Sequence, residues 1–240
     1  CGDKAATDAA MATAAHVTRL EFVNNRLIPN AIETRAANAV YIPSDESYTL
    51  YTTSQNPHVA RLVMSAFYNV APENKLRVIA PDVGGGFGAK NFLFPEYILV
   101  LFAARRLCRP VRWVSERMED FLSTAQGRDN RTRAQLALDA EGLFLGLKVE
   151  TVANLGAYLS TSGPGSSTTA PGTAMGGLYD IPAIHMDVRG AFTNTVPIDA
   201  YRGAGKPEAN YIIERLIDVA APRAGFTATE LRRRNLIASF

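Results

Sequence analysis

Four glycines and one phenylalanine fill the five positions from Gly84 to Gly88, separated by three residues from the end of the apolar segment LRVIA (76–80). Bare backbone of this kind can turn successive N–H groups outward into a concave array that suits anionic oxygen atoms. Each glycine costs conformational entropy on folding, so four of them around one phenylalanine exceed what a simple strand bulge requires. We therefore predict that Gly86, Phe87 and Gly88 approach a large cofactor, with Phe87 as a wall of the site.

Two further stretches place polar groups next to a helix start. Gln55 directly precedes an Asn-Pro pair, which is typical of an N-cap followed by the first helical position. Arg202 lies in DAYRGAGKPE (199–208), between a tyrosine and a glycine and just before another helix start. Elements of this kind usually converge on one site, so we predict that Gln55, Phe87 and Arg202 face a common ligand.

A dinucleotide site is the weaker interpretation of the glycine run. Gly84, Gly86 and Ala89 satisfy the pattern G-x-G-x-x-G/A after a strand, but that fingerprint needs a helix to open within the motif. The next helix is expected only at Pro95, and no carboxylate follows about 20 residues later. A Walker loop is excluded because Lys90 has neither the glycine before it nor the Ser or Thr after it.

Composition excludes several classes of protein. The 240-residue chain has a formal net charge of +2 and no long basic run, so no nucleic-acid partner is expected. Its longest apolar stretch, 97–104, is far below the about 20 residues that span a bilayer, and we interpret it as a buried helix. Cys1 and Cys108 support neither a disulfide framework nor a zinc site. Without a leader-like segment we expect a cytoplasmic protein, and the abrupt ends suggest a piece of a longer one.

The elements that position these groups form a mixed α and β pattern. Strands are expected over 16–25, 48–54, 76–80, 111–115 and 185–194, with a long hairpin over 131–158 that turns at 140–142. Helices should start at Pro57, near Pro95 and near Pro207, and a last one is capped by Thr227 or Thr229. Residues 1–15 suit a helix or a loose arm equally well. The segment 160–177 is too poor in large apolar residues for a core and is expected to be an extended surface or site loop.

The helix after Gln55 has an apolar face. Val59, Leu62, Val63 and Phe67 fall on one side of it at helical spacing, which predicts the side that packs against the protein.

Five stretches together resemble one known family. They are QNPH (55–58), VIAPDVGGGFGAK (78–90), GRDN (127–130), VANLGAYLSTSGPG (152–165) and DAYRGAGKPEANYIIERLIDVAA (199–221). They resemble the large subunit of the molybdenum hydroxylases, such as xanthine dehydrogenase, aldehyde oxidase and carbon monoxide dehydrogenase. The resemblance covers nearly the whole chain and implies that residues 1–240 are the first molybdopterin-binding domain of a longer subunit. The implied fold class is α+β, with mixed sheets and packed helices.

The resemblance also implies a chemistry. The family binds molybdopterin, in bacterial members usually as the cytosine dinucleotide, and hydroxylates a carbon centre with oxygen from water. Electrons pass through [2Fe–2S] clusters on a small subunit to FAD on a medium subunit. Gln55 would hydrogen-bond the oxo or hydroxo ligand of the molybdenum. Phe87 and Arg202 would present backbone amides to the metal centre, Gly86 and Gly88 would allow the close approach, and no side chain would be a direct ligand.

Departures from the family pattern narrow the expected substrate. Members that oxidise carbon monoxide have a cysteine where this chain has Gly203, so that activity is not expected. Purine-oxidising members have a glutamate and a phenylalanine where this chain has Asn91 and Ala204. The resemblance then favours an aldehyde, an aromatic compound or an N-heterocycle, with Tyr201, Ala204 and Asn91 close to it.

The resemblance also predicts what the chain lacks. The family's catalytic base is a glutamate in a Gly-rich segment that has no counterpart here, and we interpret Glu33, Glu96 and Glu208 as structural. We therefore expect no catalytic residue in this chain, which would hold one side of the cofactor and be inactive alone. The remaining alternative is a stand-alone remnant that serves as an assembly or interaction module.

Overall fold

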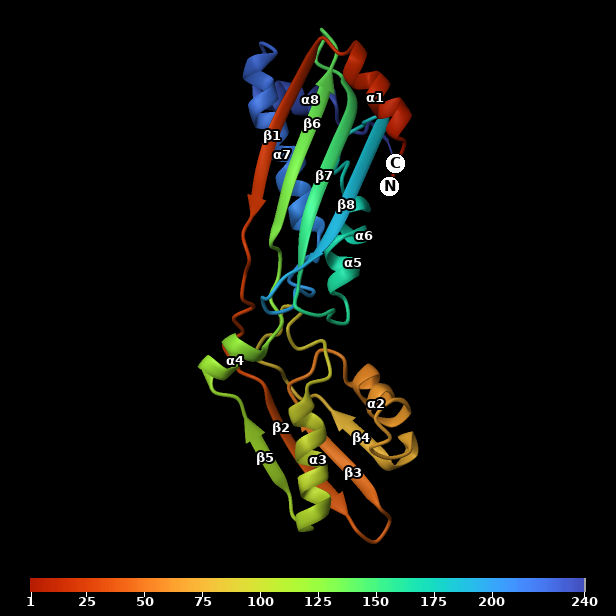
Figure 1. Ribbon diagram of the computed structural model, residues 1–240, viewed down its shortest axis with the longest axis vertical. Helices are drawn as coiled ribbons and strands as arrows, with labels where there is room; N and C mark the ends of the chain where they lie inside the picture. Colours follow the sequence, from red (N-terminus) through yellow and green to blue (C-terminus); the bar gives the residue numbers. More distant parts are fainter. Residues whose placement is uncertain (240) are drawn as a thin grey trace. The chain divides into compact units, whose positions relative to one another are not determined.

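The structure, a computed structural model, describes residues 1–239, and these form two compact units (Figure 1). The inserted unit is Ile28–Ala125, and the split unit is Cys1–Leu27 together with residues 126–239. Each unit has its own four-stranded sheet and its own hydrophobic core. The α+β class is thus as predicted, and the residues that the structure describes divide into two units with separate cores.

The split unit contains a mixed sheet in the order β1-β6-β7-β8. Its strands are β1 (His16–Asn24), β6 (Asn130–Leu138), β7 (Phe144–Gly156) and β8 (Ala183–Phe192). The first three are antiparallel, and the predicted hairpin between β6 and β7 is confirmed. β8 runs parallel to β7, and the connection between them passes through the short helices α5 (Gly163–Ser167) and α6 (Thr169–Gly172).

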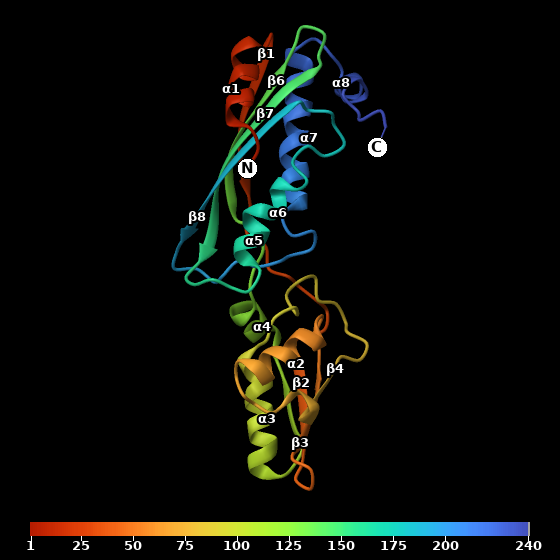
Figure 2. The ribbon, with the colours of Figure 1, turned by 90° about the vertical axis from the view of Figure 1, so that its right-hand side faces the viewer.

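Helices cover both faces of this sheet (Figure 2). On one face lie α7 (Lys206–Arg223) and α8 (Ala228–Arg234), whose apolar side chains bury Leu136 and Leu147 in the core. On the other face lies α1 (Lys4–Thr13), with the Lys148 Nζ atom 2.8 Å from Asp8 Oδ1. The alternation of β7 side chains explains the division, because Leu147 and Lys148 point to opposite faces.

The N-terminal segment is a helix, so the alternative of a loose arm is wrong. Asp3 is the N-cap of α1 and accepts a hydrogen bond from the amide of Ala6 at 2.9 Å. The N-terminal end of the segment is tied to β8, since the Met186 amide donates to the Cys1 carbonyl at 2.9 Å. Two neighbouring side chains, Lys4 and Lys148, hold the pKa of Asp8 down at about 2.

The inserted unit contains a smaller sheet in the order β4-β3-β2-β5. Its elements are β2 (Ala36–Ile42), β3 (Ser47–Thr52), α2 (Pro57–Ala66), the 3-10 helix η1 (Glu73–Lys75), β4 (Leu76–Ile79), α3 (Pro95–Leu107), β5 (Val111–Val114) and α4 (Arg117–Ser123). β3 and β4 are parallel and α2 connects them, whereas the other pairs are antiparallel. The core gathers Leu50, Met64, Tyr97 and Leu101 from the sheet, α2 and α3.

Both longer helices of this unit begin where predicted, but α2 buries a different face from the one expected. Asn56 caps α2 through the amide of Val59, yet the helix buries Ala60 and Met64. The predicted core face, Val59, Leu62, Val63 and Phe67, is largely outward, and Phe67 is 75% exposed. The expectation that residues 97–104 form a buried helix holds for one side of α3 only, because Leu99 and Phe102 are exposed on the other.

The segment 160–177 is more ordered and more buried than an extended loop. Besides α5 and α6, it places Met175 in the core of the split unit. A Cβ atom on Gly163 would lie 2.1 Å from the carbonyl oxygen of Ile198, so the backbone itself packs here. Close backbone packing explains why few large apolar side chains are needed.

Across residues 1–239, no helix combines the length and the apolar character that crossing a membrane requires.

Candidate functional site

The glycine run forms a tight left-handed turn after β4. The φ angles of Gly85, Phe87 and Gly88 are +95°, +54° and +104°. Hydrogen bonds from the Ala89 amide to the Gly86 carbonyl (2.9 Å) and from the Asn91 amide to the Gly88 carbonyl (3.2 Å) close the turn. A bulky non-glycine residue at positive φ is a genuine outlier, which is typical of sites where backbone conformation serves function. Because the run opens no helix, the structure does not support a dinucleotide fingerprint.

The side-chain amide of Gln55 is hydrogen-bonded to this turn. Its Oε1 atom accepts hydrogen bonds from the backbone N–H groups of Gly88 (2.9 Å) and Lys90 (3.2 Å). Its backbone amide donates to the Lys90 carbonyl at 2.8 Å. Backbone N–H groups can only donate, so the accepting atom is the oxygen and the two Nε2 hydrogens are directed elsewhere. The structure therefore presents Gln55 as an oriented donor at the surface of the inserted unit.

Glycine at position 86 is required by this arrangement. A Cβ atom there would lie 2.3 Å from Oε1 of Gln55 and 2.5 Å from its Cδ. The φ angle of Gly86 is not in the left-handed region, so the need is for close approach and not for an unusual backbone conformation.

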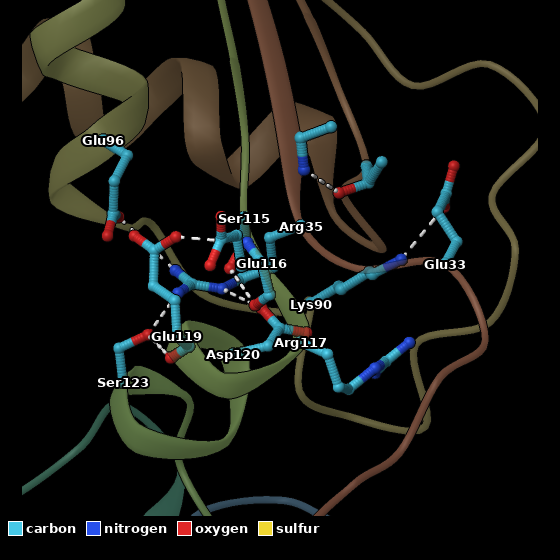
Figure 3. Close-up of polar contacts among 12 residues, drawn as sticks. Glu33, Arg35, Lys90, Glu96, Ser115, Glu116, Arg117, Glu119, Asp120 and Ser123 are labelled. Atoms are coloured by element: carbon cyan, nitrogen blue, oxygen red, sulfur yellow. Dashed lines mark hydrogen bonds and ion pairs between the residues drawn. The ribbon is translucent and has the colours of Figure 1, made fainter.

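An ion pair between the buried Lys90 and the partly exposed Glu33 lies beside the glycine run (Figure 3). The Lys90 side chain is 2% exposed, and its Nζ atom lies 2.9 Å from Oε2 of Glu33. The same oxygen accepts a hydrogen bond from the amide of Gly84 at 2.8 Å. One carboxylate thus holds the first and the last part of the glycine turn.

Arg35, the residue directly before β2, forms ion pairs within the same unit. Its guanidinium is 1% exposed and lies 2.9 Å from Oδ1 of Asp120 and 3.4 Å from Oε2 of Glu96 (Figure 3). It also stacks over the ring of Phe94, 3.9 Å from the centroid. Buried charges are costly unless paired and hydrogen-bonded, and here the pairs join β2 to the starts of α3 and α4.

A second left-handed turn lies in the split unit, immediately before α7. Gly203, Ala204 and Gly205 have φ angles of +93°, +42° and +88°. The Ala204 amide donates to the Tyr201 carbonyl at 2.6 Å, which closes the turn around Arg202.

Arg128 supports this turn and was not identified from the sequence. Its NH2 group donates to the Arg202 carbonyl at 2.8 Å, and its NH1 group donates to the Tyr201 carbonyl at 3.1 Å. NH1 also lies 3.3 Å from Oε1 of the buried Glu208. Burial raises the pKa of Glu208 above its usual value, although the Arg128 charge opposes the shift. The only available signal was the GRDN stretch, which contains a charged pair directly before a buried strand.

The predicted site residues fall into two groups. Gln55, Gly86, Phe87, Gly88 and Asn91 come together in the inserted unit through the contacts given above.

Tyr201, Arg202 and Ala204 lie together in the split unit. Among residues 1–239, no cluster of three or more His, Cys, Asp or Glu side chains is arranged to hold a metal ion.

Comparison with known proteins identifies the family. Residues 1–236 match the family described as molybdopterin cofactor-binding domain. The chain belongs to this family. The molybdopterin-binding domain is also 39% identical to the carbon monoxide dehydrogenase large chain of Hydrogenophaga pseudoflava, over 98% of this chain and 30% of that protein. The predicted relationship to the large subunits of molybdenum hydroxylases is confirmed.

Two further relatives are named for other activities. The domain is 34% identical to the nicotine 6-hydroxylase large subunit of Paenarthrobacter nicotinovorans, over 97% of this chain and 29% of that protein. The crystal structure of quinoline 2-oxidoreductase from Pseudomonas putida 86 superimposes with a TM-score of 0.89 at 36% identity, covering 95% of this chain and 29% of that one. The domain therefore spans about 30% of the length of the relatives it matches.

Proposed function

We propose that this domain binds one side of a molybdopterin cofactor within a molybdenum-dependent hydroxylase. The observation that supports the proposal most is the orientation of Gln55, whose oxygen is held by the Gly88 and Lys90 amides. That leaves a neutral donor, fixed beside a turn of bare backbone, which suits the oxygen-rich periphery of such a cofactor.

The residues present fit the group. Gly86 leaves no space for a side chain beside Gln55, and Gly88 adopts a conformation that favours glycine, so the backbone can approach a large ligand. Phe87 and Arg202 would contribute backbone amides, each from a left-handed turn. When bound, the cofactor would supply the redox chemistry by which a carbon centre is hydroxylated with oxygen from water.

The protein's own contribution would be positioning. Gln55 would hold the cofactor through its Nε2 hydrogens, and no side chain of this chain would coordinate the metal. Glu33, Glu96 and Glu208 all lie in ion pairs with Lys90, Arg35 and Arg128, which suits structural roles better than proton transfer. We propose that the catalytic base lies outside this chain and that the chain alone is inactive.

The proposed substrate is an aldehyde, an aromatic compound or an N-heterocycle. Gly203 stands where carbon monoxide oxidisers would have a cysteine, and Asn91, Tyr201 and Ala204 would lie near the substrate. The cofactor would be the cytosine dinucleotide form. The proposed partners are the remainder of the large subunit, a medium subunit with FAD and a small subunit with [2Fe–2S] clusters, all in the cytoplasm.

Metal and pterin analysis tests the proposal. The full-length protein that contains this chain, purified with its partner subunits, should contain stoichiometric molybdenum and oxidise at least one compound of a panel from the three classes. The isolated chain should show no turnover. A full-length protein without molybdenum or pterin would instead favour an assembly or interaction module.

A further inference from the structure

We propose that Arg128 is the positioning residue that sets the direction of the Arg202 amide. The inference rests on the proposed function for the role of that amide, whereas the geometry on which it is built is independent of any ligand. Arg128 is separated from the turn by more than 70 residues of sequence, yet it contacts two of its consecutive carbonyl groups.

Because each peptide unit is planar, these two contacts also fix the direction of the N–H groups that follow the two carbonyls. In a trans peptide the C=O and the following N–H lie in one plane and point in opposite directions. The Tyr201 carbonyl shares its peptide unit with the Arg202 N–H, and the Arg202 carbonyl shares its unit with the Gly203 N–H. Because Arg128 draws both carbonyls toward its guanidinium, the N–H groups of Arg202 and Gly203 are turned to the opposite side.

The shape of the guanidinium makes this arrangement specific to arginine. Its donors form a rigid planar fork, so one group can serve two carbonyls and a carboxylate at once. The NH2 group of Arg128 donates to the Arg202 carbonyl, and its NH1 group donates to the Tyr201 carbonyl and to the Glu208 carboxylate. The Cζ atom of the guanidinium lies 4.9 Å from the centroid of the Tyr201 ring. A lysine would keep the charge but has no rigid fork with which to hold both carbonyl groups.

The backbone around Arg128 is itself constrained. Arg128 and Asp129 are consecutive non-glycine residues at φ angles of +65° and +70°, which persist only where the surroundings determine them. The Asp129 carboxylate accepts hydrogen bonds from Arg26 (2.9 Å) and Asn154 (2.8 Å), and these fix the segment in place. Arg128 is 8% exposed, so its side chain extends from a strained, anchored position into the interior behind the Arg202 turn.

Hydrogen–deuterium exchange of the full-length protein tests the geometric part. Arg128→Lys should accelerate exchange in peptides covering 201–206 by about tenfold or more, because hydrogen bonds to a charged group are lost. Exchange within β7 should not change. The matched control is Arg131→Lys, the same substitution three residues away at an exposed position of β6, which should leave both regions unchanged. Equal exchange in the Arg128→Lys and control proteins at 201–206 would overturn the proposal.

The spectrum of the loaded enzyme tests the link to the cofactor. At equal molybdenum content, the Mo(V) electron paramagnetic resonance signal should differ between Arg128→Lys and the wild type, and should be unaltered in Arg131→Lys. An identical signal in all three proteins would overturn the proposed role.

If Arg128→Lys does not fold, the Glu208→Gln variant replaces it. Glu208→Gln removes only the charge that orients Arg128, and hydrogen exchange and the Mo(V) signal are measured in the same way. A wild-type protein without molybdenum refutes the proposed function, while the exchange result still decides whether Arg128 directs the turn.

Discussion

A Cβ atom on Gly86 would lie 2.3 Å from Oε1 of Gln55, the oxygen that also accepts the Gly88 and Lys90 amides. No side chain can therefore be added at position 86 unless Gln55 moves. The atoms that would clash are the far end of a flexible side chain, so the fold can adjust at small cost while the orientation of Gln55 is lost.

Gly86→Ala should accordingly damage function far more than stability. We expect the free energy of unfolding to fall by about 1 kcal/mol, from the loss of hydrogen bonds to Gln55. Turnover by the full-length enzyme should fall about 100-fold, as when one preorganised donor is removed. Gly165→Ala is the control, because a Cβ atom there meets only Thr169 at 3.8 Å. Wild-type turnover in Gly86→Ala would refute the close-approach argument.

Two substitutions of Gln55 separate the role of its Oε1 atom, which accepts hydrogen bonds from the turn, from the role of its Nε2 donor. A glutamate can still accept from the Gly88 and Lys90 amides but has no Nε2 hydrogens, so Gln55→Glu should preserve the turn and lose the donor. Gln55→Ala loses both. We expect both variants to retain molybdenum and both to turn over about 100-fold more slowly. Wild-type steady-state rates in Gln55→Glu would show that the donor has no role.

The ion pair between Glu33 and Lys90 should respond asymmetrically to removal of either partner. Glu33→Gln leaves a buried ammonium without its counter-ion, and because the Glu33 side chain is 37% exposed we expect a loss of roughly 1–3 kcal/mol. Lys90→Met should cost less, since the remaining carboxylate reaches water and keeps the Gly84 amide. Urea denaturation of both variants and the double variant measures this. A larger loss for Lys90→Met than for Glu33→Gln would contradict the burial argument.

Glu208 should introduce a specific pH dependence of stability. Its pKa is higher in the folded protein, chiefly because of burial and against the opposing charge of Arg128. Between about pH 4.5, where the carboxyl titrates in the unfolded chain, and its folded pKa, the folded state binds more protons. The free energy of unfolding therefore falls as pH rises through this window. Subtracting the denaturation profile of Glu208→Gln from that of the wild type should reveal this slope, and parallel profiles would show that Glu208 is not responsible.

The starts of the helices could be predicted because their signals are local. Asn56 with Pro57 and the proline at 95 specify N-termini through groups only a few residues apart, and the structure places α2 and α3 at those positions. The glycine turn could be predicted in the same way, because backbone positions with positive φ angles, such as Gly85 and Gly88, favour glycine.

The burial of α2 and the role of Arg128 could not be predicted in this way. Which face of α2 is covered depends on the position of the sheet beneath it, and the sheet covers Ala60 and Met64 and leaves the more apolar face with Phe67 outward. Arg128 meets Glu208 across 80 residues of sequence, and periodicity carries no information about such a pair.

We propose that Gln55, Phe87 and Arg202 serve one molybdenum cofactor, and a crystal structure of the full-length, molybdenum-loaded enzyme would show whether they do. The quantities to measure are the distances from Gln55 Nε2 and from the backbone nitrogens of Phe87 and Arg202 to the nearest cofactor atoms. We predict that all three lie within hydrogen-bonding distance of the same cofactor. A cofactor bound elsewhere, with these three nitrogens distant from it, would contradict the account.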